Sequence, residues 1–150
     1  MVYKLIQEFK KKYPATIAWR IKKHSKVIET HLNPGEKVLY AFAAQKNASL
    51  TQIFHTFAIV ITNKRILLAQ KRVVFGYLFY SITPDLFNDL KVTAGLIWGK
   101  VIIDTVKERI ILSNIDKKAL DEIETNISEN MMKQKKEYNK LVWTLISRYQ

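Results

Sequence analysis

The 150-residue sequence predicts an α+β fold in which helices at both ends flank seven consecutive β-strands. Apolar residues recur with the helical period over the first 32 residues and again after residue 116. Between residues 36 and 113, short apolar and aromatic runs alternate with turn residues at the spacing of a sandwich or barrel. The chain has no cysteine, which excludes a disulfide framework, a thiol nucleophile and a cysteine-ligated metal site. A chain of this length can bury one hydrophobic core without such cross-links.

The first 32 residues predict two helical pieces. An apolar stripe with i, i+3, i+4, i+7 and i+11 spacing defines the first: Val2, Leu5, Ile6, Phe9 and Tyr13. Pro14 disfavours helical geometry at the preceding residue, so we expect a break there. The second piece is expected over residues 15–32, and one of its faces carries Ile17, Ile21, His24 and Ile28. A turn at Asn33-Pro34-Gly35 ends it.

A change to alternating periodicity at residue 36 marks the start of the strands. We expect strands over residues 36–46, 54–62, 65–70, 73–82, 89–94, 100–105 and 109–113. Asn63 lies in the tight turn between the second and third strands, where its tolerance of positive φ suits a hairpin. Lys71-Arg72 and Thr83-Pro84-Asp85 mark the next two turns.

A final helix is predicted after the seventh strand, with Asn114 or Asp116 as its N-cap. One apolar face of this helix carries Leu120, Ile123, Ile127 and Met131. Acidic residues lie near its start and lysines near its end, as the helix dipole favours. A second apolar stripe predicts an additional C-terminal helix, and it comprises Tyr138, Leu141, Val142, Leu145, Ile146 and Tyr149.

Four short motifs occur in order along the chain: NPGEKVL (33–39), ITNKRI (61–66), GLIWGK (95–100) and LSNID (112–116). Their order and spacing resemble bacterial pleckstrin-homology (PH) domains of the YokE type. The resemblance covers about residues 33–131 and implies a partly open seven-stranded barrel, plugged by the helix that carries Leu120, Ile123 and Ile127. We therefore divide the chain into basic N-terminal helices (1–32), a PH-like barrel with its plugging helix (33–136) and a C-terminal helix (137–150).

No pattern in the sequence predicts an enzyme. His24, His31 and His55 have no acidic residues at the spacing of a metal site or catalytic triad, so we expect packed or surface histidines. There is no phosphate-binding glycine loop and no nucleophile motif. We therefore expect no catalytic residues, no metal and no cofactor, and we interpret the protein as a non-enzymatic binding or assembly module.

The resemblance to PH domains implies that the first, third and sixth inter-strand loops gather at the open rim of the barrel. This would bring together four candidates for binding an anion or a lipid headgroup: Lys46, Lys71, Arg72 and Lys107. The phosphoinositide-binding pattern has further basic residues along the second strand. Residues 54–62 contain no Lys or Arg, which argues against that specific ligand.

The net charge of +12 is concentrated at the two ends of the chain, with +7 over residues 1–28 and +4 over residues 131–150. Basic and aromatic residues of the N-terminal end form a second candidate surface for a membrane or a partner: Lys10, Lys11, Lys12, Trp19, Arg20, Lys22, Lys23 and Lys26. Packing of the apolar stripe within the protein, with the lysines in water, is the favoured alternative.

These observations favour a protein partner or self-association, with an anionic membrane surface as a further candidate. A module that binds nucleic acid is the alternative function, because the basic excess suits phosphate contacts. It ranks lower, since no RNA-recognition or zinc-finger signature is present. The absence of cysteine, of a signal peptide and of a long apolar segment predicts a cytoplasmic protein, either free or peripherally attached to a membrane.

Overall fold

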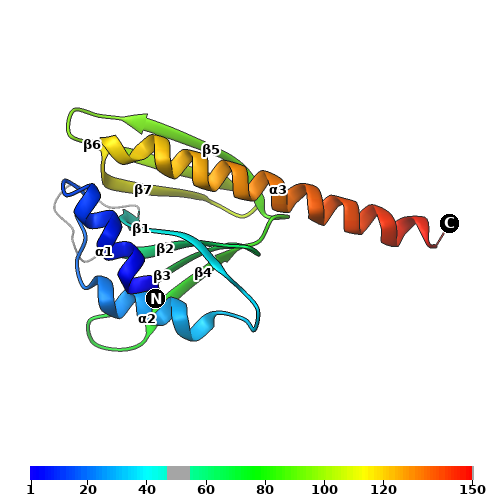
Figure 1. Cartoon of the computed structure of the whole chain (residues 1–150), viewed down its shortest axis with the longest axis horizontal. Coiled ribbons are helices and arrows are strands. Elements are labelled where there is room, and N and C mark those ends of the chain that lie inside the picture. The colour runs from blue at the N-terminus through cyan, green and yellow to red at the C-terminus, as the bar shows by residue number, and fades with distance from the viewer. Residues whose placement is uncertain (47–54, 150) are drawn as a thin grey trace.

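The described residues contain the seven strands that the sequence predicts, and these strands form one antiparallel sheet. The computed structural model describes residues 1–46 and 55–149. The strands are β1 (Val38–Lys46), β2 (Thr56–Thr62), β3 (Ile66–Lys71), β4 (Tyr77–Ile82), β5 (Phe87–Ala94), β6 (Trp98–Thr105) and β7 (Arg109–Asp116). The helices are α1 (Val2–Lys12), α2 (Ile21–His31) and α3 (Leu120–Ser147) (Figure 1). The order of the strands in the sheet is β4-β3-β2-β1-β7-β6-β5. The two edge strands, β4 and β5, are not paired with each other, so the barrel is partly open.

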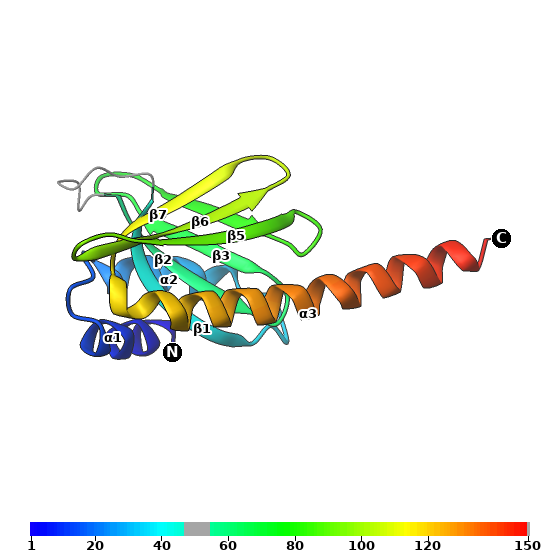
Figure 2. The same ribbon diagram turned by 90° about the horizontal axis from the view of Figure 1, so that it is seen from above.

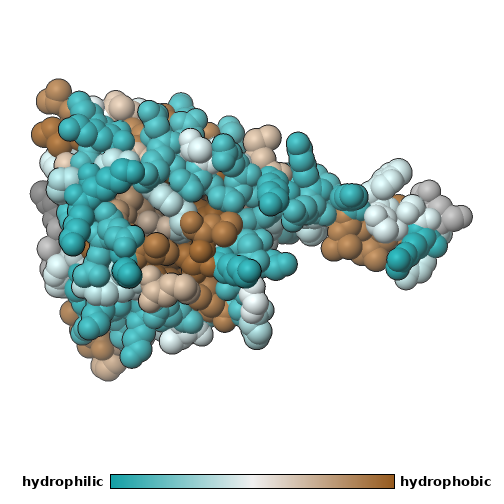
Figure 3. Space-filling view, viewed as in Figure 1, coloured by the Kyte–Doolittle hydropathy of each residue, from teal (hydrophilic) through white to brown (hydrophobic). Residues whose placement is uncertain are grey.

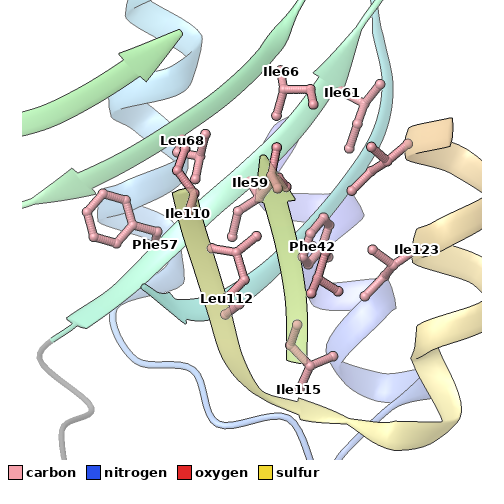
Figure 4. Packing of buried hydrophobic residues seen from close by; sticks show 14 of the residues in the cluster. Phe42, Phe57, Ile59, Ile61, Ile66, Leu68, Ile110, Leu112, Ile115 and Ile123 are labelled. Atoms are coloured by element: carbon pink, nitrogen blue, oxygen red, sulfur yellow. The ribbon is translucent and has the colours of Figure 1, made fainter. Parts of the chain in front are cut away.

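The interior of the barrel is closed by the first half of α3. Alternate residues of the strands point inward, among them Phe42, Ile59 and Leu112 (Figure 4). The buried face of α3 completes this core with Leu120, Ile123, Ile127 and Met131. The expected plugging face of the final helix is therefore confirmed.

The N-terminal helices cover the outer face of β1, β2 and β3. Val2 and Ile6 of α1 and Val27 and Ile28 of α2 form a second core with the outward-pointing residues of these strands. Four of the strand residues are alanines, whose small side chains allow close packing of the helices: Ala41, Ala43, Ala58 and Ala69. Every residue of β2 is consequently buried. The apolar N-terminal stripe packs within the protein, as the favoured alternative predicts.

The prediction that the second helix begins near residue 15 is wrong, because α2 begins at Ile21. Residues 14–20 instead cross the end of the barrel as a non-helical segment. The Ile17 N–H donates to the Asn114 carbonyl at 3.0 Å, and the Asp116 N–H donates to Thr16 Oγ1 at 2.9 Å. Arg20 then takes a left-handed backbone conformation with φ of 55°, which interrupts any helix before Ile21.

Two strand boundaries differ from the prediction by three residues or more, and the others differ by at most two. The fourth strand begins at Tyr77 rather than at residue 73, because residues 73–75 lie in an exposed loop that Gly76 closes with a φ of 68°. The seventh strand continues to Asp116, so Asn114 is a strand residue and not a helix cap. Asp116 caps the 3₁₀ turn Lys117–Ala119 that leads into α3, and its side chain accepts a hydrogen bond from the Lys118 N–H at 3.0 Å. The N-cap of α3 itself is Ala119, which has no side-chain capping bond. Phe54, expected to begin the second strand, lies outside the described residues.

The two predicted C-terminal stripes lie on one continuous helix. α3 runs from Leu120 to Ser147 without a break at residue 136. Its second half projects beyond the barrel in both views (Figures 1 and 2). The additional C-terminal helix expected from the second stripe is thus an extension of the plugging helix.

Candidate functional site

A pocket of about 810 Å³ lies where the ends of β1 and β3 meet the start of α2. We call it the basic pocket. The strand and helix ends that line it lie at the end of the molecule opposite the projecting half of α3 (Figures 1 and 2). Its cationic lining residues are Arg20, Lys46, Lys71 and Arg72, and its aromatic ones are Trp19, Phe57, Phe75 and Tyr80. His24, His55, Gln70, Val73, Val74 and Leu78 complete the lining.

Aromatic rings hold two of the cations in place. The Lys46 ammonium lies 4.5 Å from the ring centroid of Tyr80 and 5.8 Å from that of Phe57. The Arg20 guanidinium lies 5.3 Å from the ring of Trp19 and donates from one terminal nitrogen to the Lys71 carbonyl at 3.3 Å. Such contacts restrict long flexible side chains without neutralising their charge.

His24 anchors the end of β3 to α2. Its Nδ1 accepts a hydrogen bond from the Lys71 N–H at 2.8 Å, which places the imidazole proton on Nε2. The pKa of His24 is lowered to about 4, mainly by burial and to a smaller extent by the nearby Arg20 cation, while the Trp19 carbonyl acts in the opposite direction. His24 is therefore neutral at pH 7 and keeps Lys71 and Arg72 beside α2.

An apolar loop tip adjoins the cations. Val73, Val74 and Phe75 are 61%, 76% and 84% exposed, directly after Lys71 and Arg72. The Arg72 N–H donates to the Gly76 carbonyl at 3.0 Å and closes the loop at its base. The loop thus presents three apolar side chains to solvent at the rim of the basic pocket.

The structure brings together residues from both predicted candidate groups. Lys46, Lys71 and Arg72 of the rim group line the basic pocket, whereas Lys107 does not. Trp19 and Arg20 of the N-terminal group join them, because the non-helical segment 14–20 carries them to the end of β3. The aromatic wall of Phe57 and Tyr80 was not predicted, since it depends on how β2, β3 and β4 pair.

The remaining N-terminal candidates lie outside the basic pocket. Lys10 donates to the carbonyls of Pro14 and Thr16, and burial lowers its pKa although Asp116 acts in the opposite direction. Lys12 pairs with Glu122 of α3 at 2.6 Å. The other four are exposed: Lys11, Lys22, Lys23 and Lys26.

The chemistry of the basic pocket suits an anion. Four cations line it, and none of its described lining residues is an Asp or Glu. Cationic donors without a competing carboxylate bind phosphate, sulfate or carboxylate groups. Within residues 1–46 and 55–149, no group of His, Cys, Asp and Glu residues could hold a metal ion.

The family model described as "Bacterial PH domain" matches residues 32–129, which is more than half of the chain. This chain belongs to the bacterial PH-domain family. A comparison with curated proteins finds no match. Among solved structures, the chain is similar to a DUF1696-family protein with a PH domain from Shewanella loihica PV-4, with 16% identity and a TM-score of 0.48. That match covers 76% of this chain and 92% of the other.

It is also similar to a PH domain from Shewanella amazonensis SB2B, with 17% identity, a TM-score of 0.44, and coverage of 78% and 89% of the two chains. PH-domain families are generally non-catalytic binding folds. The narrower YokE-type likeness stays a prediction. Among the described helices of this PH-domain protein, none is long and apolar enough to cross a membrane.

The PH-like sequence motifs correspond to structural contacts in this protein. Glu36 of the first motif pairs with Arg65 of the second. Gly99 of the third motif lies where the helix meets β6, and a Cβ there would come within 2.8 Å of Leu120 Cγ. Residues of the first three motifs therefore make contacts that join the sheet to its flanking segment and to α3.

Proposed function

We propose that this bacterial PH-domain protein is a non-enzymatic binding module that takes a phosphate-bearing anion in the basic pocket. The observation that carries the proposal is the convergence of Arg20, Lys46, Lys71 and Arg72 on one pocket whose described lining has no carboxylate. Two of these cations are oriented by aromatic rings, so less side-chain entropy is lost when an anion binds.

The neighbouring loop favours a lipid headgroup as the source of the phosphate. Val73, Val74 and Phe75 form an exposed apolar tip beside the cations. A tip of this kind can enter the interface of a bilayer while the adjacent cations contact headgroup phosphates. A soluble phosphate ester would use the same cations but gain nothing from the tip.

Two probes test the site: inositol hexakisphosphate by titration calorimetry, and phosphatidylglycerol vesicles by flotation. Lys71→Glu/Arg72→Glu should weaken binding of the soluble probe at least about tenfold, because each cation near a phosphate contributes on the order of 1 kcal/mol. Lys64→Glu/Lys100→Glu is the matched control, since it changes the net charge equally but lies outside the basic pocket. Equal losses in both variants would show that only net charge matters and would contradict the proposal.

Phe75→Asp separates the two sources of phosphate. It should reduce vesicle binding and leave binding of inositol hexakisphosphate nearly unchanged if the loop tip enters a bilayer. If neither probe binds and a DNA duplex does, the nucleic-acid alternative replaces the proposed function. Filter binding of the duplex at matched ionic strength makes that comparison.

A further inference from the structure

The last part of α3 has no partner within the described protein. Gln134 and Lys135 anchor the helix to the barrel, with donated hydrogen bonds to the carbonyls of Thr62 at 2.7 Å and Phe87 at 2.5 Å. Beyond them, every residue over 136–149 is exposed except Val142, which is half-buried. The projecting half of α3 therefore extends into solvent (Figure 2).

This segment is strongly two-sided. One face carries an apolar stripe at helical spacing, consisting of Tyr138, Leu141, Val142, Leu145 and Tyr149. Ile146 widens the stripe, whereas Trp143, which is 69% exposed, lies toward the polar face, about 100° around the helix from Val142. Figure 3 shows a hydrophobic patch on this end of the molecule. The opposite face is polar and carries Lys140, Thr144 and Ser147. An exposed apolar stripe of this length indicates a binding surface.

The charges of the segment decide between its candidate occupants. Residues 136–149 contain three basic residues, Lys136, Lys140 and Arg148, and one acidic residue, Glu137. Two copies of this helix, paired through the stripe, would bring together two segments of the same positive sign, which disfavours pairing. An anionic bilayer is complementary to both faces, because it offers an apolar interior beside negatively charged headgroups. Tyr138 and Tyr149 add aromatic side chains that favour the membrane interface.

We propose that residues 136–149, which are the projecting half of α3 and the two residues after it, lie along the surface of an anionic membrane. The stripe faces the acyl boundary, and Lys136, Lys140 and Arg148 face the headgroups. The helical part, residues 136–147, is roughly 18 Å long at 1.5 Å per residue, which suits a helix lying in the plane of the interface. This attachment does not rest on ligand binding in the basic pocket, which lies at the other end of the molecule (Figure 1).

Flotation of the full chain with vesicles tests the attachment. The protein should bind vesicles of phosphatidylcholine and phosphatidylglycerol at low salt, bind phosphatidylcholine alone weakly, and dissociate as salt is raised. Leu141→Glu/Leu145→Glu removes two stripe residues and should weaken the partition coefficient at least about a hundredfold. Thr144→Glu/Ser147→Glu makes the same charge change on the polar face and should weaken it far less. All four side chains are exposed, so both variants should unfold at the wild-type temperature.

Fluorescence quenching by brominated acyl chains locates the contact. In Trp143→Phe/Leu145→Trp the indole at this end of the protein lies on the stripe, so its quenching should exceed that of Trp143 in the wild type, which lies toward the polar face. The attachment would be overturned if the wild-type protein did not bind phosphatidylglycerol vesicles at low salt. It would also be overturned if the two glutamate variants lost vesicle binding equally. A dimer in sedimentation that Leu141→Glu/Leu145→Glu converts to monomer, without lipid-dependent quenching, would assign the stripe to a second copy instead.

The outcomes of the two proposals can be distinguished. Inositol hexakisphosphate titration of Lys71→Glu/Arg72→Glu reports on the basic pocket alone. Because Trp19 lines that pocket, the quenching that reports on α3 is the difference between Trp143→Phe/Leu145→Trp and Trp143→Phe. This difference should persist when Lys71→Glu/Arg72→Glu is added, and its loss would show that α3 does not attach independently.

Discussion

Arg65 and Glu36 form a two-point ion pair that ties the start of β3 to the segment before β1. Arg65 Nε lies 3.0 Å from Glu36 Oε2, and a terminal nitrogen of Arg65 lies 3.0 Å from Oε1. The Glu36 side chain is 1% exposed and also accepts from the Thr62 hydroxyl at 2.6 Å and the Asn33 N–H at 3.0 Å. Arg65 further donates to the His31 carbonyl and to Ser81. One ion pair therefore links α2, β2, β3 and β4.

Arg65→Ala should lower the free energy of unfolding by about 3 kcal/mol, because it leaves the buried Glu36 carboxylate without its counter-ion. Urea denaturation followed by circular dichroism measures the change. Lys64→Ala is the control, since Lys64 is exposed in the same turn, and it should change stability by less than about 0.5 kcal/mol. Equal effects of the two substitutions would contradict the structural role of the pair.

Acidification should remove the stabilisation that the same ion pair provides. Burial raises the pKa of Glu36, but hydrogen bonds from Arg65, Thr62 and Asn33 outweigh it and hold the pKa below its ordinary value of 4.5. The stabilisation is present above pH 4.5 and is lost as the pH falls through the lower folded-state pKa. We expect this acid loss of stability to shrink in Arg65→Ala, as measured by urea denaturation below pH 4.5.

Protonation linked to His24 should lower the stability of the protein at higher pH than protonation of Glu36 does. Its pKa is about 4 in the folded protein, mainly through burial, and 6.5 is its ordinary value. The unfolded chain therefore takes up this proton first as the pH falls, and stability should drop between pH 6.5 and 4 by up to about 3 kcal/mol. His24→Asn retains an acceptor for the Lys71 N–H but does not titrate. The urea denaturation midpoint of this variant should therefore depend less on pH across this window. His55→Asn, at an exposed position, should leave the wild-type slope intact.

Ile127 should carry a large share of the packing between α3 and the barrel. It is fully buried among the inward-pointing strand residues, so Ile127→Ala should cost about 2–5 kcal/mol. Thermal unfolding or urea denaturation measures the loss. Met132→Ala changes an exposed residue of the same helix and should have little effect. Wild-type stability in Ile127→Ala would mean that α3 does not plug the barrel in solution.

We predict that residues 33–136 fold alone as a β-rich barrel. Removal of α1 and α2 would uncover the outer face of β1–β3, including Val60 and Leu67, so we expect the fragment to bind a hydrophobic dye and to be less stable than the full chain. Circular dichroism and dye fluorescence test both expectations. A fragment without cooperative unfolding would show that the N-terminal helices are part of the folding unit.

Local patterns in the sequence were sufficient to predict the strands, the apolar face of α3 and the break at Pro14. Each of these depends on neighbours within a few residues, such as the alternation in β2 or the spacing of Leu120, Ile123 and Ile127. The resemblance to bacterial PH domains, and not the spacing, implied that this face plugs the barrel. Of the two capping residues predicted, Asn114 lies within β7, and Asp116 caps the 3₁₀ turn that leads into α3.

Tertiary structure decided the start of α2, the exposure of residues 73–75 and the assembly of the basic pocket. The hydrogen bonds of residues 14–20 to the end of β7 compete with helix formation, although the sequence there has a helical apolar period. Arg20 and Lys71 are distant in the sequence and meet only because α2 packs on the outer face of β3. The two apolar stripes of α3 have similar spacing, yet the first is buried and the second is exposed. Their burial differs because the helix extends beyond the end of the barrel. The spacing of apolar residues within a helix does not indicate where the barrel that covers the helix ends.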